Sequence, residues 1–382
     1  MENSHLSALF VGVTDNRRAH LRYHDLTDLL FLCICATLCG ADAYTQIASF
    51  GEERLAWLQK FGSFANGIPS HDTIQRVLEL LDPRELERLL ARWAQEMSEL
   101  SDSSTFAIDG KAVRGTWKKT GSPGLTLVSV WASEQRLCLG IEAVQATGGE
   151  QLAAQSLLNL ISIKGKIITA DANFLTASCC RQIVEAKGDY VIALKVNQPT
   201  LLAATEAVFA THTRDVTQGK GFDEAETIEK NKGRLETRWC ISIGCSDQLD
   251  ASFVEKWPGL RTLIQVTRHR VVQKGGVAKE EEQVHYYVSS LLANATRFQE
   301  LIRGHWGIEN QQHYVLDVVL NEDGSTIRTG HGPKNMAILR RISLNLAQQH
   351  KPAKISLKGA LFKAALSTKR LENLLLGPKS DA

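Results

Sequence analysis

The stretch Thr105-Phe-Ala-Ile-Asp-Gly-Lys-Ala-Val-Arg-Gly115 decides how the rest of this chain is interpreted. Phe106 to Ile108 is a short apolar run, which is typical of a buried strand. We expect this strand to end on Asp109, with Gly110 allowing the backbone to turn sharply. A carboxylate at the end of a central strand lies at the edge of a sheet, where it can hold a cation and reach a substrate. An isolated Asp-Gly pair is more often a solvated turn. The interpretation as a catalytic carboxylate therefore depends on a second copy of this arrangement further along the chain.

The second copy is Lys166-Ile-Ile-Thr-Ala-Asp171, another apolar run that ends on an aspartate. Two carboxylates at neighbouring strand ends can share divalent cations, and hard oxygen ligands suit Mg²⁺ or Mn²⁺. Two such ions can activate a water or a 3′-hydroxyl and stabilise the leaving oxygen of a phosphodiester. The scheme needs a third carboxylate from another element. Four residues are candidates: Glu309, Asp317, Glu322 and Asp323.

Glu309 is the preferred third carboxylate because it lies in a stretch with helical spacing, just after a basic and aromatic cluster. In that cluster, Arg303 or His305 is a candidate ligand for the scissile phosphate. Trp306 is assigned to core packing, with stacking on a base as the alternative. Asp317 lies eight residues after Glu309, so an uninterrupted helix would place both on one face.

The pattern around these residues predicts three regions. Residues 1–100 read as a small all-helical domain, in which Ser70 or Asp72 caps a helix and Asp82-Pro83 precedes the last one. From about residue 101, three strands are followed by helix, strand, helix and strand, which is the order of a ribonuclease-H-like mixed α/β sheet. A β-rich insertion is expected at about 197–290, with a loop at 274–276. After it we expect a helix from Ala295 to about Val319 and another near Asn335–Gln348. The chain is expected to end in a basic tail at 351–382.

Composition limits the classes of function. The chain has 382 residues with a net charge of only +2, so any nucleic-acid surface must come from local clusters of basic residues. The tail holds seven Lys or Arg against two acidic residues, and is expected either to bind phosphate or to be solvated. The eight cysteines are expected to be reduced and mostly buried, and their spacing does not suggest structural zinc. No leader-like segment is recognisable and the longest apolar run is short, so a cytoplasmic protein is expected.

Several motifs in one order closely resemble the DDE transposases of bacterial insertion sequences, in the branch that includes the H-repeat-associated proteins. They span roughly residues 12–350. The segments that carry the resemblance are Pro69-Ser-His-Asp-Thr73, Ala107-Ile-Asp-Gly-Lys111 with Arg114, Leu127-Val-Ser-Val-Trp-Ala-Ser133, Gly188-Asp-Tyr-Val-Ile-Ala-Leu-Lys195 with Asn197-Gln-Pro199, Arg303-Gly-His-Trp-Gly-Ile-Glu-Asn310, His313-Tyr-Val-Leu-Asp-Val318, Asn321-Glu-Asp323 and Asn335-Met-Ala-Ile-Leu-Arg-Arg341.

The resemblance implies a catalytic and metal-binding triad of Asp109, Asp171 and Glu309, two Mg²⁺ or Mn²⁺ ions, and action on double-stranded DNA at terminal inverted repeats and at a target. It also implies assembly as a homo-oligomer on DNA in the bacterial cytosol, at the nucleoid. Contacts with DNA are assigned to seven residues: Lys111, Arg114, Lys195, Lys232, Arg234, Arg303 and His305.

The chain departs from the family pattern at five positions, none of them a presumed metal ligand. Lys232 and Thr176 stand where the family often has His and Gln. Ile302, His305 and Leu316 stand where the broader clan has Tyr, Arg and Lys. These departures keep two alternatives open: a catalytically inactive, transposase-derived DNA-binding or regulatory protein, and a nuclease that uses the same triad without strand transfer.

Overall fold

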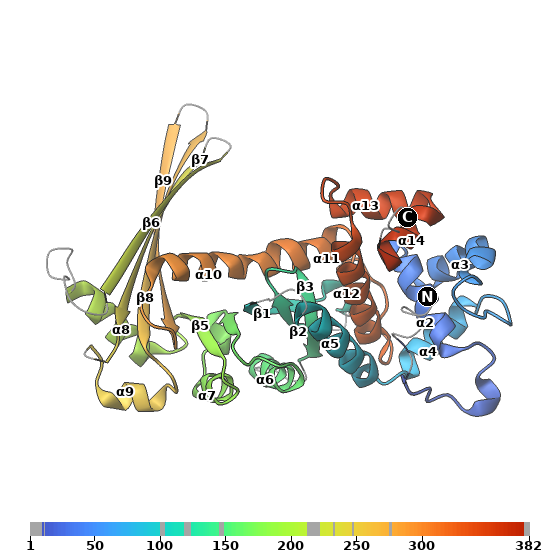
Figure 1. Ribbon diagram of the computed structural model, residues 1–382, viewed down its shortest axis with the longest axis horizontal. Coiled ribbons are helices and arrows are strands. Elements are labelled where there is room, and N and C mark those ends of the chain that lie inside the picture. The colour runs from blue at the N-terminus through green and yellow to red at the C-terminus, as the bar shows by residue number, and fades with distance from the viewer. Residues whose placement is uncertain are drawn as a thin grey trace. The chain divides into compact units, whose positions relative to one another are not determined.

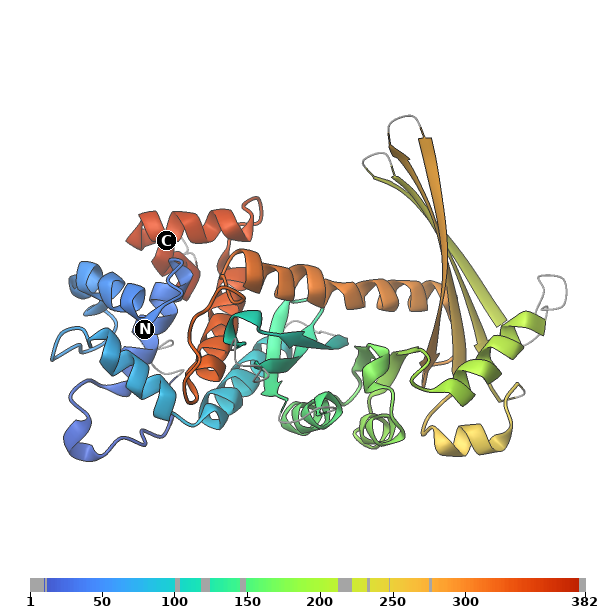
Figure 2. The same ribbon diagram turned by 180° about the vertical axis from the view of Figure 1, so that it is seen from behind.

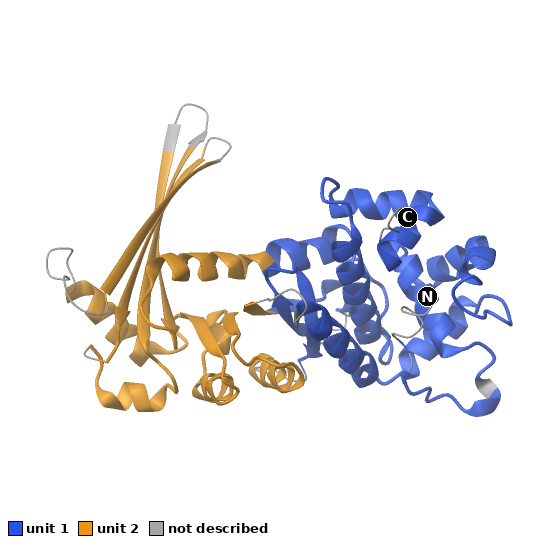
Figure 3. Ribbon diagram, in the orientation of Figure 1, with its two compact units in different colours: residues 1–102, 110–147, 308–382 blue, residues 103–109, 148–307 orange. Residues whose placement is uncertain are grey.

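The computed structural model describes residues 10, 12–99, 104–117, 124–144, 149–211, 222–231, 234–246, 248–274 and 277–377. The chain forms two compact units, shown in Figure 3. Unit 1 comprises residues 1–102, 110–147 and 308–382, and unit 2 comprises residues 103–109 and 148–307. The division falls within strand β1 (Thr105–Ala112), whose residues belong to both units.

Unit 2 contains a mixed sheet. Its hydrogen-bonded order is β1-β4-β5-β9-β8-β7-β6, with β1, β4 and β5 parallel and the others antiparallel. The strands after β1 are β4 (Ile167–Ala170), β5 (Asp189–Leu194), β6 (Phe222–Asn231), β7 (Arg234–Gly244), β8 (Thr262–Lys274) and β9 (Val277–Ser289). All four residues of β4 are buried, as expected of a parallel strand that is covered on both faces.

Helices pack against the sheet of unit 2, as Figure 1 shows. They are α6 (Glu150–Leu160), α7 (Ala177–Glu185), α8 (Pro199–Thr211), α9 (Ala251–Lys256) and α10 (Ala295–Gly307), with a short 3₁₀ turn, η3 (Ala172–Phe174). Phe298, Leu301 and Ile302 of α10 lie in one core cluster with Cys240, Ile264 and Val266 of the antiparallel strands. The helical spacing of these apolar residues therefore serves to cover one face of the sheet.

Unit 1 contains a hairpin and most of the helices. Its strands run in the order β3-β2-β1, where β2 is Thr126–Ala132 and β3 is Leu137–Ala143. Two 3₁₀ turns are η1 (Ala19–Leu21) and η2 (Arg114–Thr116), and the π-helical segment is η4 (Ile308–His313). The α-helices are α2 (Leu26–Leu38), α3 (Tyr44–Leu58), α4 (His71–Leu80), α5 (Pro83–Glu99), α11 (Tyr314–Val318), α12 (Gly332–His350), α13 (Leu357–Leu366) and α14 (Thr368–Leu376).

Helix α12 is the centre of unit 1. It is buried along most of its length and packs against α2, α4, α5, α14 and β3, which can be followed in Figures 1 and 2. The side-chain amide of Asn345 donates to the Cys138 carbonyl oxygen, and its oxygen accepts from the Cys138 N–H, both at 2.8 Å. These two bonds attach the helix to strand β3.

The ribonuclease-H-like order of elements is confirmed: a meander of three strands, then α6, β4, α7 and β5. The expected N-terminal helices are present, with Asp25 capping α2 and Ser70 capping α4. In the part of the chain that the structure describes, no helix is both long and apolar enough to cross a membrane.

Three features differ from expectation. The insertion at 197–290 begins with helix α8, and its strands continue the main sheet because β9 pairs with β5. Residues 357–376, expected in a tail, form α13 and α14, which bury Leu361 and Leu371. The helices of residues 1–100 belong to the same unit as α12, because α2 buries its apolar side chains there.

Gly275 and Gly276 of the expected loop lie outside the described residues.

Candidate active site

Asp109 and Asp171 follow paired residues of two parallel strands. In the register of β1 and β4 the last pair is Ile108 with Ala170, so each aspartate comes immediately after a member of that pair. Both are partly buried. The sequence therefore correctly predicted that two carboxylates emerge together at one edge of the sheet.

Strand β1 does not end on Asp109, contrary to expectation. It continues through Ala112, and Gly110 is one of its strand residues rather than a turn. Only the pairing with β4 stops at Ile108. Because side chains alternate along a strand, Asp109 and Lys111 lie on the same face of β1.

Asp171 is held by Lys195, which directly follows strand β5. The Lys195 ammonium donates to Asp171 Oδ1 at 2.8 Å. Partial burial tends to raise the pKa of Asp171, but the hydrogen bonds from Lys195 and the Ala172 backbone, with the charges of Lys195 and His305, outweigh it and lower the pKa. Asn197 donates to the Ala172 carbonyl at 2.6 Å and so fixes the loop that carries Lys195. The assigned role of Lys195 in binding DNA is not tested by this contact.

His305 lies on α10, with its Nδ1 3.1 Å from the hydroxyl of Thr169 on β4. Burial lowers the pKa of His305 to about 4, and the positive charge of Lys195 adds to this, while Asp171 opposes it. The imidazole is therefore neutral at neutral pH. The assignment of His305 to a contact with DNA is not tested by this geometry.

The other basic residues assigned to DNA are largely paired with carboxylates. Arg303 on α10 forms an ion pair with Glu229 on β6, and Arg234 lies 3.4 Å from Glu236 on the same strand, β7. Each of these contacts neutralises part of the positive charge that the sequence suggested. Lys232 lies outside the described residues.

Glu309 is exposed and belongs to the π-helical segment η4, between α10 and α11. The expected regular helix from 295 to 319 is therefore interrupted by a π-helical segment. Whether Glu309 and Asp317 share a face stays a prediction. Short π-helical segments are frequent at functional sites. Trp306, assigned to the core, is 51% exposed, so that assignment is wrong.

The other candidate carboxylates have different partners, all within unit 1. Glu322 is completely buried and accepts from both terminal nitrogens of Arg341 on α12. The Lys111 ammonium lies 2.6 Å from Asp317 and 3.1 Å from Asp323. These three carboxylates therefore have cationic partners within unit 1.

The expectation that Lys111 contacts DNA is corrected by the same geometry. Its side chain is only 7% exposed and lies between two carboxylates. Arg114, by contrast, has an exposed side chain, and its guanidinium is 3.8 Å from Asp323. The partners of Lys111 are more than 200 residues away in sequence, so no local pattern points to them.

The donor set suits a hard divalent cation. Asp109 and Asp171 are two carboxylates that follow neighbouring strands of unit 2, and carboxylate oxygens are the ligands that such cations prefer. Across the described ranges, no three His, Cys, Asp or Glu side chains are grouped tightly enough to be identified as a metal site.

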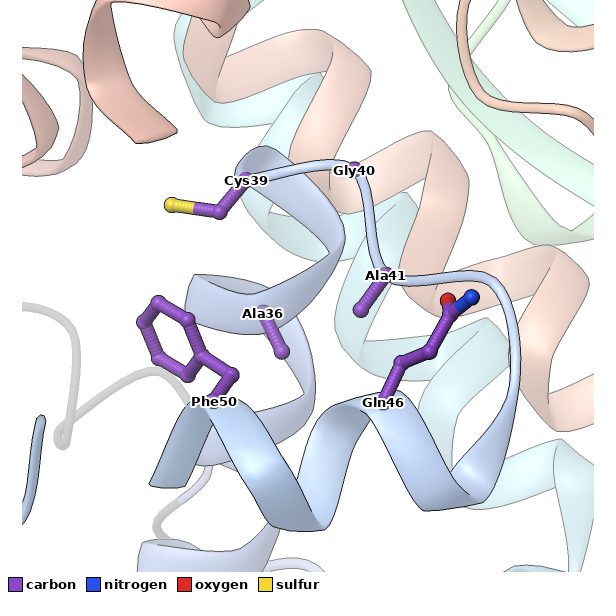
Figure 4. A pocket seen from close by; sticks show the side chains of 6 residues that line it. All are labelled: Ala36, Cys39, Gly40, Ala41, Gln46 and Phe50. Atoms are coloured by element: carbon purple, nitrogen blue, oxygen red, sulfur yellow. The ribbon is translucent and has the colours of Figure 1, made fainter. Parts of the chain in front are cut away.

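A pocket elsewhere in unit 1 lies between the end of α2 and the first turns of α3 (Figure 4). Its lining is Ala36, Cys39, Gly40, Ala41, Gln46 and Phe50. These side chains offer one amide and one thiol, and burial raises the pKa of the Cys39 thiol to about 12. The lining therefore has neither a carboxylate nor a reactive thiolate for catalysis.

Comparison with known proteins gives consistent results. The family model described as "Transposase DDE domain" matches residues 100–346, and the model described as "DDE_Tnp_1-associated" matches residues 7–94. The chain is 36% identical over 364 residues to the putative transposase YncI of Escherichia coli O157:H7, covering 95% of this chain and 92% of the relative. It is 33% identical over 366 residues to the H repeat-associated putative transposase YhhI of Escherichia coli strain K12, covering 96% of each.

Among solved structures, a piggyBac transposase synaptic complex with hairpin DNA is similar, with 11% sequence identity and a TM-score of 0.41. The likeness covers 98% of this chain and 80% of that chain. A likeness of this degree carries no argument about the site.

Proposed function

This chain belongs to the transposase DDE-domain family, and on that premise we propose that it is a metal-dependent transposase that cleaves DNA at the ends of an insertion sequence and joins them to a target. The observation that carries the proposal is the register of β1 and β4, which brings Asp109 and Asp171 to one edge of the sheet. Together with Glu309, these residues form the Asp-Asp-Glu triad. The matches to the two family models support a division into an accessory helical region and a catalytic region.

In this proposal Asp109, Asp171 and Glu309 hold two Mg²⁺ or Mn²⁺ ions. The bound ions supply Lewis acidity, which activates a water for cleavage or a 3′-hydroxyl for strand transfer and stabilises the leaving oxygen. Lys195 keeps Asp171 ionised by lowering its pKa, so that the carboxylate is ready as a ligand. Neutral His305, bonded to Thr169, positions the end of α10 next to β4.

The proposed substrate is double-stranded DNA carrying terminal inverted repeats, together with target DNA. Arg114, Lys195, Lys232, Arg234 and Arg303 are the proposed phosphate contacts. Four of them, Arg114, Lys195, Arg234 and Arg303, now lie within 4 Å of a carboxylate, which phosphate would have to replace. Because two ends must be held together, we propose a homo-oligomer on DNA, in the bacterial cytosol at the nucleoid.

The proposal is tested with purified protein on duplex DNA that carries the ends of its own element. Asp109→Asn should lower nicking in Mg²⁺ by at least about 1,000-fold, since a lost metal ligand removes transition-state stabilisation of several kcal/mol. Binding to the same duplex should change little, because the substitution removes a negative charge only. Asp250→Asn, at the exposed start of α9, is the control that removes a carboxylate elsewhere.

The products separate the alternatives. Nicked and joined ends indicate a transposase, and nicked ends without joined products indicate a nuclease. End-specific binding without metal-dependent cleavage by the wild-type protein indicates an inactive DNA-binding protein. Wild-type-like nicking by the Asp109→Asn variant would refute the assignment of the triad.

A further inference from the structure

Lys111 and its two carboxylate partners join parts of unit 1 that are distant in sequence. Lys111 lies on β1, Asp317 on α11, and Asp323 in the turn that follows α11. The ammonium is 2.6 Å from one carboxylate and 3.1 Å from the other, and the lysine side chain is nearly completely buried. An ion pair partly shielded from water in this way is screened less than one at the surface, and removing one partner leaves charge without compensation.

Backbone contacts reinforce this connection. The Arg114 N–H donates to Asp323 Oδ1 at 3.1 Å, and Arg328 donates to the Gly115 carbonyl at 2.8 Å. Gly115 packs so closely on the turn that an added Cβ would lie 2.4 Å from the Ser325 carbonyl oxygen. The segment Lys111–Gly115 and the segment Asp317–Arg328 therefore dock through both side chains and backbone.

The docked turn is also held from its other side. Glu322, next to Asp323, is completely buried and bonded to Arg341 of α12. The turn thus lies between β1 and α12, the central helix of the unit. Movement of the turn would break a buried ion pair on either side, which makes one position strongly preferred.

These contacts have a consequence for the triad, and here the inference rests on the proposed function. Asp109 is two residues before Lys111 on the same face of β1. Glu309 is eight residues before Asp317 along η4 and α11. We propose that Lys111 is a positioning residue: with Asp317 and Asp323 it clamps the strand that carries Asp109 to the segment that carries Glu309, without touching DNA or metal.

The test compares two buried lysines. Lys111→Met removes the clamp and leaves Asp317 and Asp323 without their ammonium. Lys334→Met is the matched control, because Lys334 of α12 is likewise poorly exposed and paired with two carboxylates, Glu87 and Glu142, in the same unit. Both variants should lose thermal stability, since each leaves carboxylates without their charge partner.

Only Lys111→Met should slow single-turnover nicking, by roughly 100-fold, which is the size of effect caused by a misplacement of about 1 Å. The dissociation constant for the end-containing duplex should stay within about threefold of wild type. The triple variant Lys111→Met, Asp317→Asn, Asp323→Asn removes the unpaired charges as well; it should regain stability and still nick slowly.

Amide hydrogen exchange gives a readout that does not depend on cleavage. In Lys111→Met, exchange should rise in residues 105–116 and 314–328, and in Lys334→Met it should not. Absence of nicking by the wild-type protein would refute the proposed function, while the exchange data would still decide whether the clamp exists.

The clamp would be overturned if Lys111→Met nicked at the wild-type rate, or if the Lys334→Met control lost nicking equally. It would also be overturned if Lys111→Met lost only DNA affinity, or if its amide exchange in residues 105–116 and 314–328 were unchanged.

Discussion

Charged side chains of this protein are placed in three distinct environments. Lys195 and Asp171 meet at a partly exposed sheet edge, whereas Lys111 is enclosed by Asp317 and Asp323. Arg341 and Glu322 have no exposed side-chain surface at all. The first pair can open to admit a ligand, and the buried ones cannot separate without leaving a charge in a medium of low dielectric.

The buried pair predicts a strong effect of substitution at Arg341. Arg341→Met should destabilise the protein by about 3–5 kcal/mol, because it leaves the Glu322 carboxylate buried without its partner. Thermal and denaturant unfolding measure this loss. The double variant Arg341→Met, Glu322→Met should regain most of it, and a double variant as unstable as the single one would contradict the explanation.

The same pair predicts a pH dependence. Burial tends to raise the pKa of Glu322, but the charge and hydrogen bonds of Arg341 outweigh it and lower the pKa below the ordinary value of 4.5. An acid whose pKa is lower in the folded state binds fewer protons than it does unfolded, so its contribution is complete above about pH 4.5 and is lost as pH falls below that value. Unfolding curves from pH 7 to pH 3 should show this loss in wild type and lack it in the double variant.

At the scale of elements, the docking of η2 onto the turn after α11 depends on Gly115. The sequence motif does not show whether this glycine is needed for close packing or only for backbone flexibility. A Cβ on Gly115 would meet two carbonyl oxygens, those of Ser325 at 2.4 Å and Asp323 at 2.6 Å. A Cβ on Gly304, in the interior of α10, would meet nothing within 4 Å. The two positions therefore respond in opposite directions to the same substitution.

Gly115→Ala should destabilise the protein by about 1–3 kcal/mol, because backbone atoms cannot yield as a flexible side chain can. Gly304→Ala should stabilise it by about 0.5–1 kcal/mol, since alanine loses less conformational entropy in a helix. Denaturant midpoints of the two variants, measured in parallel, check both signs. Stabilisation by Gly115→Ala would show that the docked arrangement is wrong.

At the scale of the molecule, the N-terminal helices share a core with distant parts of the chain. Helix α2 is buried almost throughout and packs against α12, and Trp57 of α3 donates to Glu372 of α14 at 2.7 Å. The apolar surfaces that α2 and α5 bury against α12 would be open to water in a shorter fragment. Residues 1–100 are thus continuous in sequence, but in the fold they are one part of unit 1.

We therefore expect a fragment of residues 1–100 to lack a cooperative thermal transition and to give poorly dispersed amide resonances. Without α12 it cannot bury enough apolar surface to offset its conformational entropy. Circular dichroism and two-dimensional NMR of the fragment test this, with the full chain as the control. A sharp transition and dispersed resonances would show that the region folds alone.

Local pattern was sufficient for most elements and for the pair Asp109 and Asp171. Apolar runs of the right length end beside both aspartates, and parallel strands bring such ends to one edge, so alternation and chain order alone led to the correct placement. The cap of helix α4 was narrowed to Ser70 or Asp72 from the sequence, and the structure shows Ser70 in that role. Such features depend on residues within a few positions of one another.

Only the tertiary structure decided which charges are buried and with which partners. Lys111 looked like a phosphate ligand until Asp317 and Asp323, more than 200 residues later, enclosed its ammonium. The lowered pKa of His305 and the exposure of Trp306 also arise from long-range packing. Desolvation and charge pairing depend on distances in space, and sequence separation carries no information about those distances.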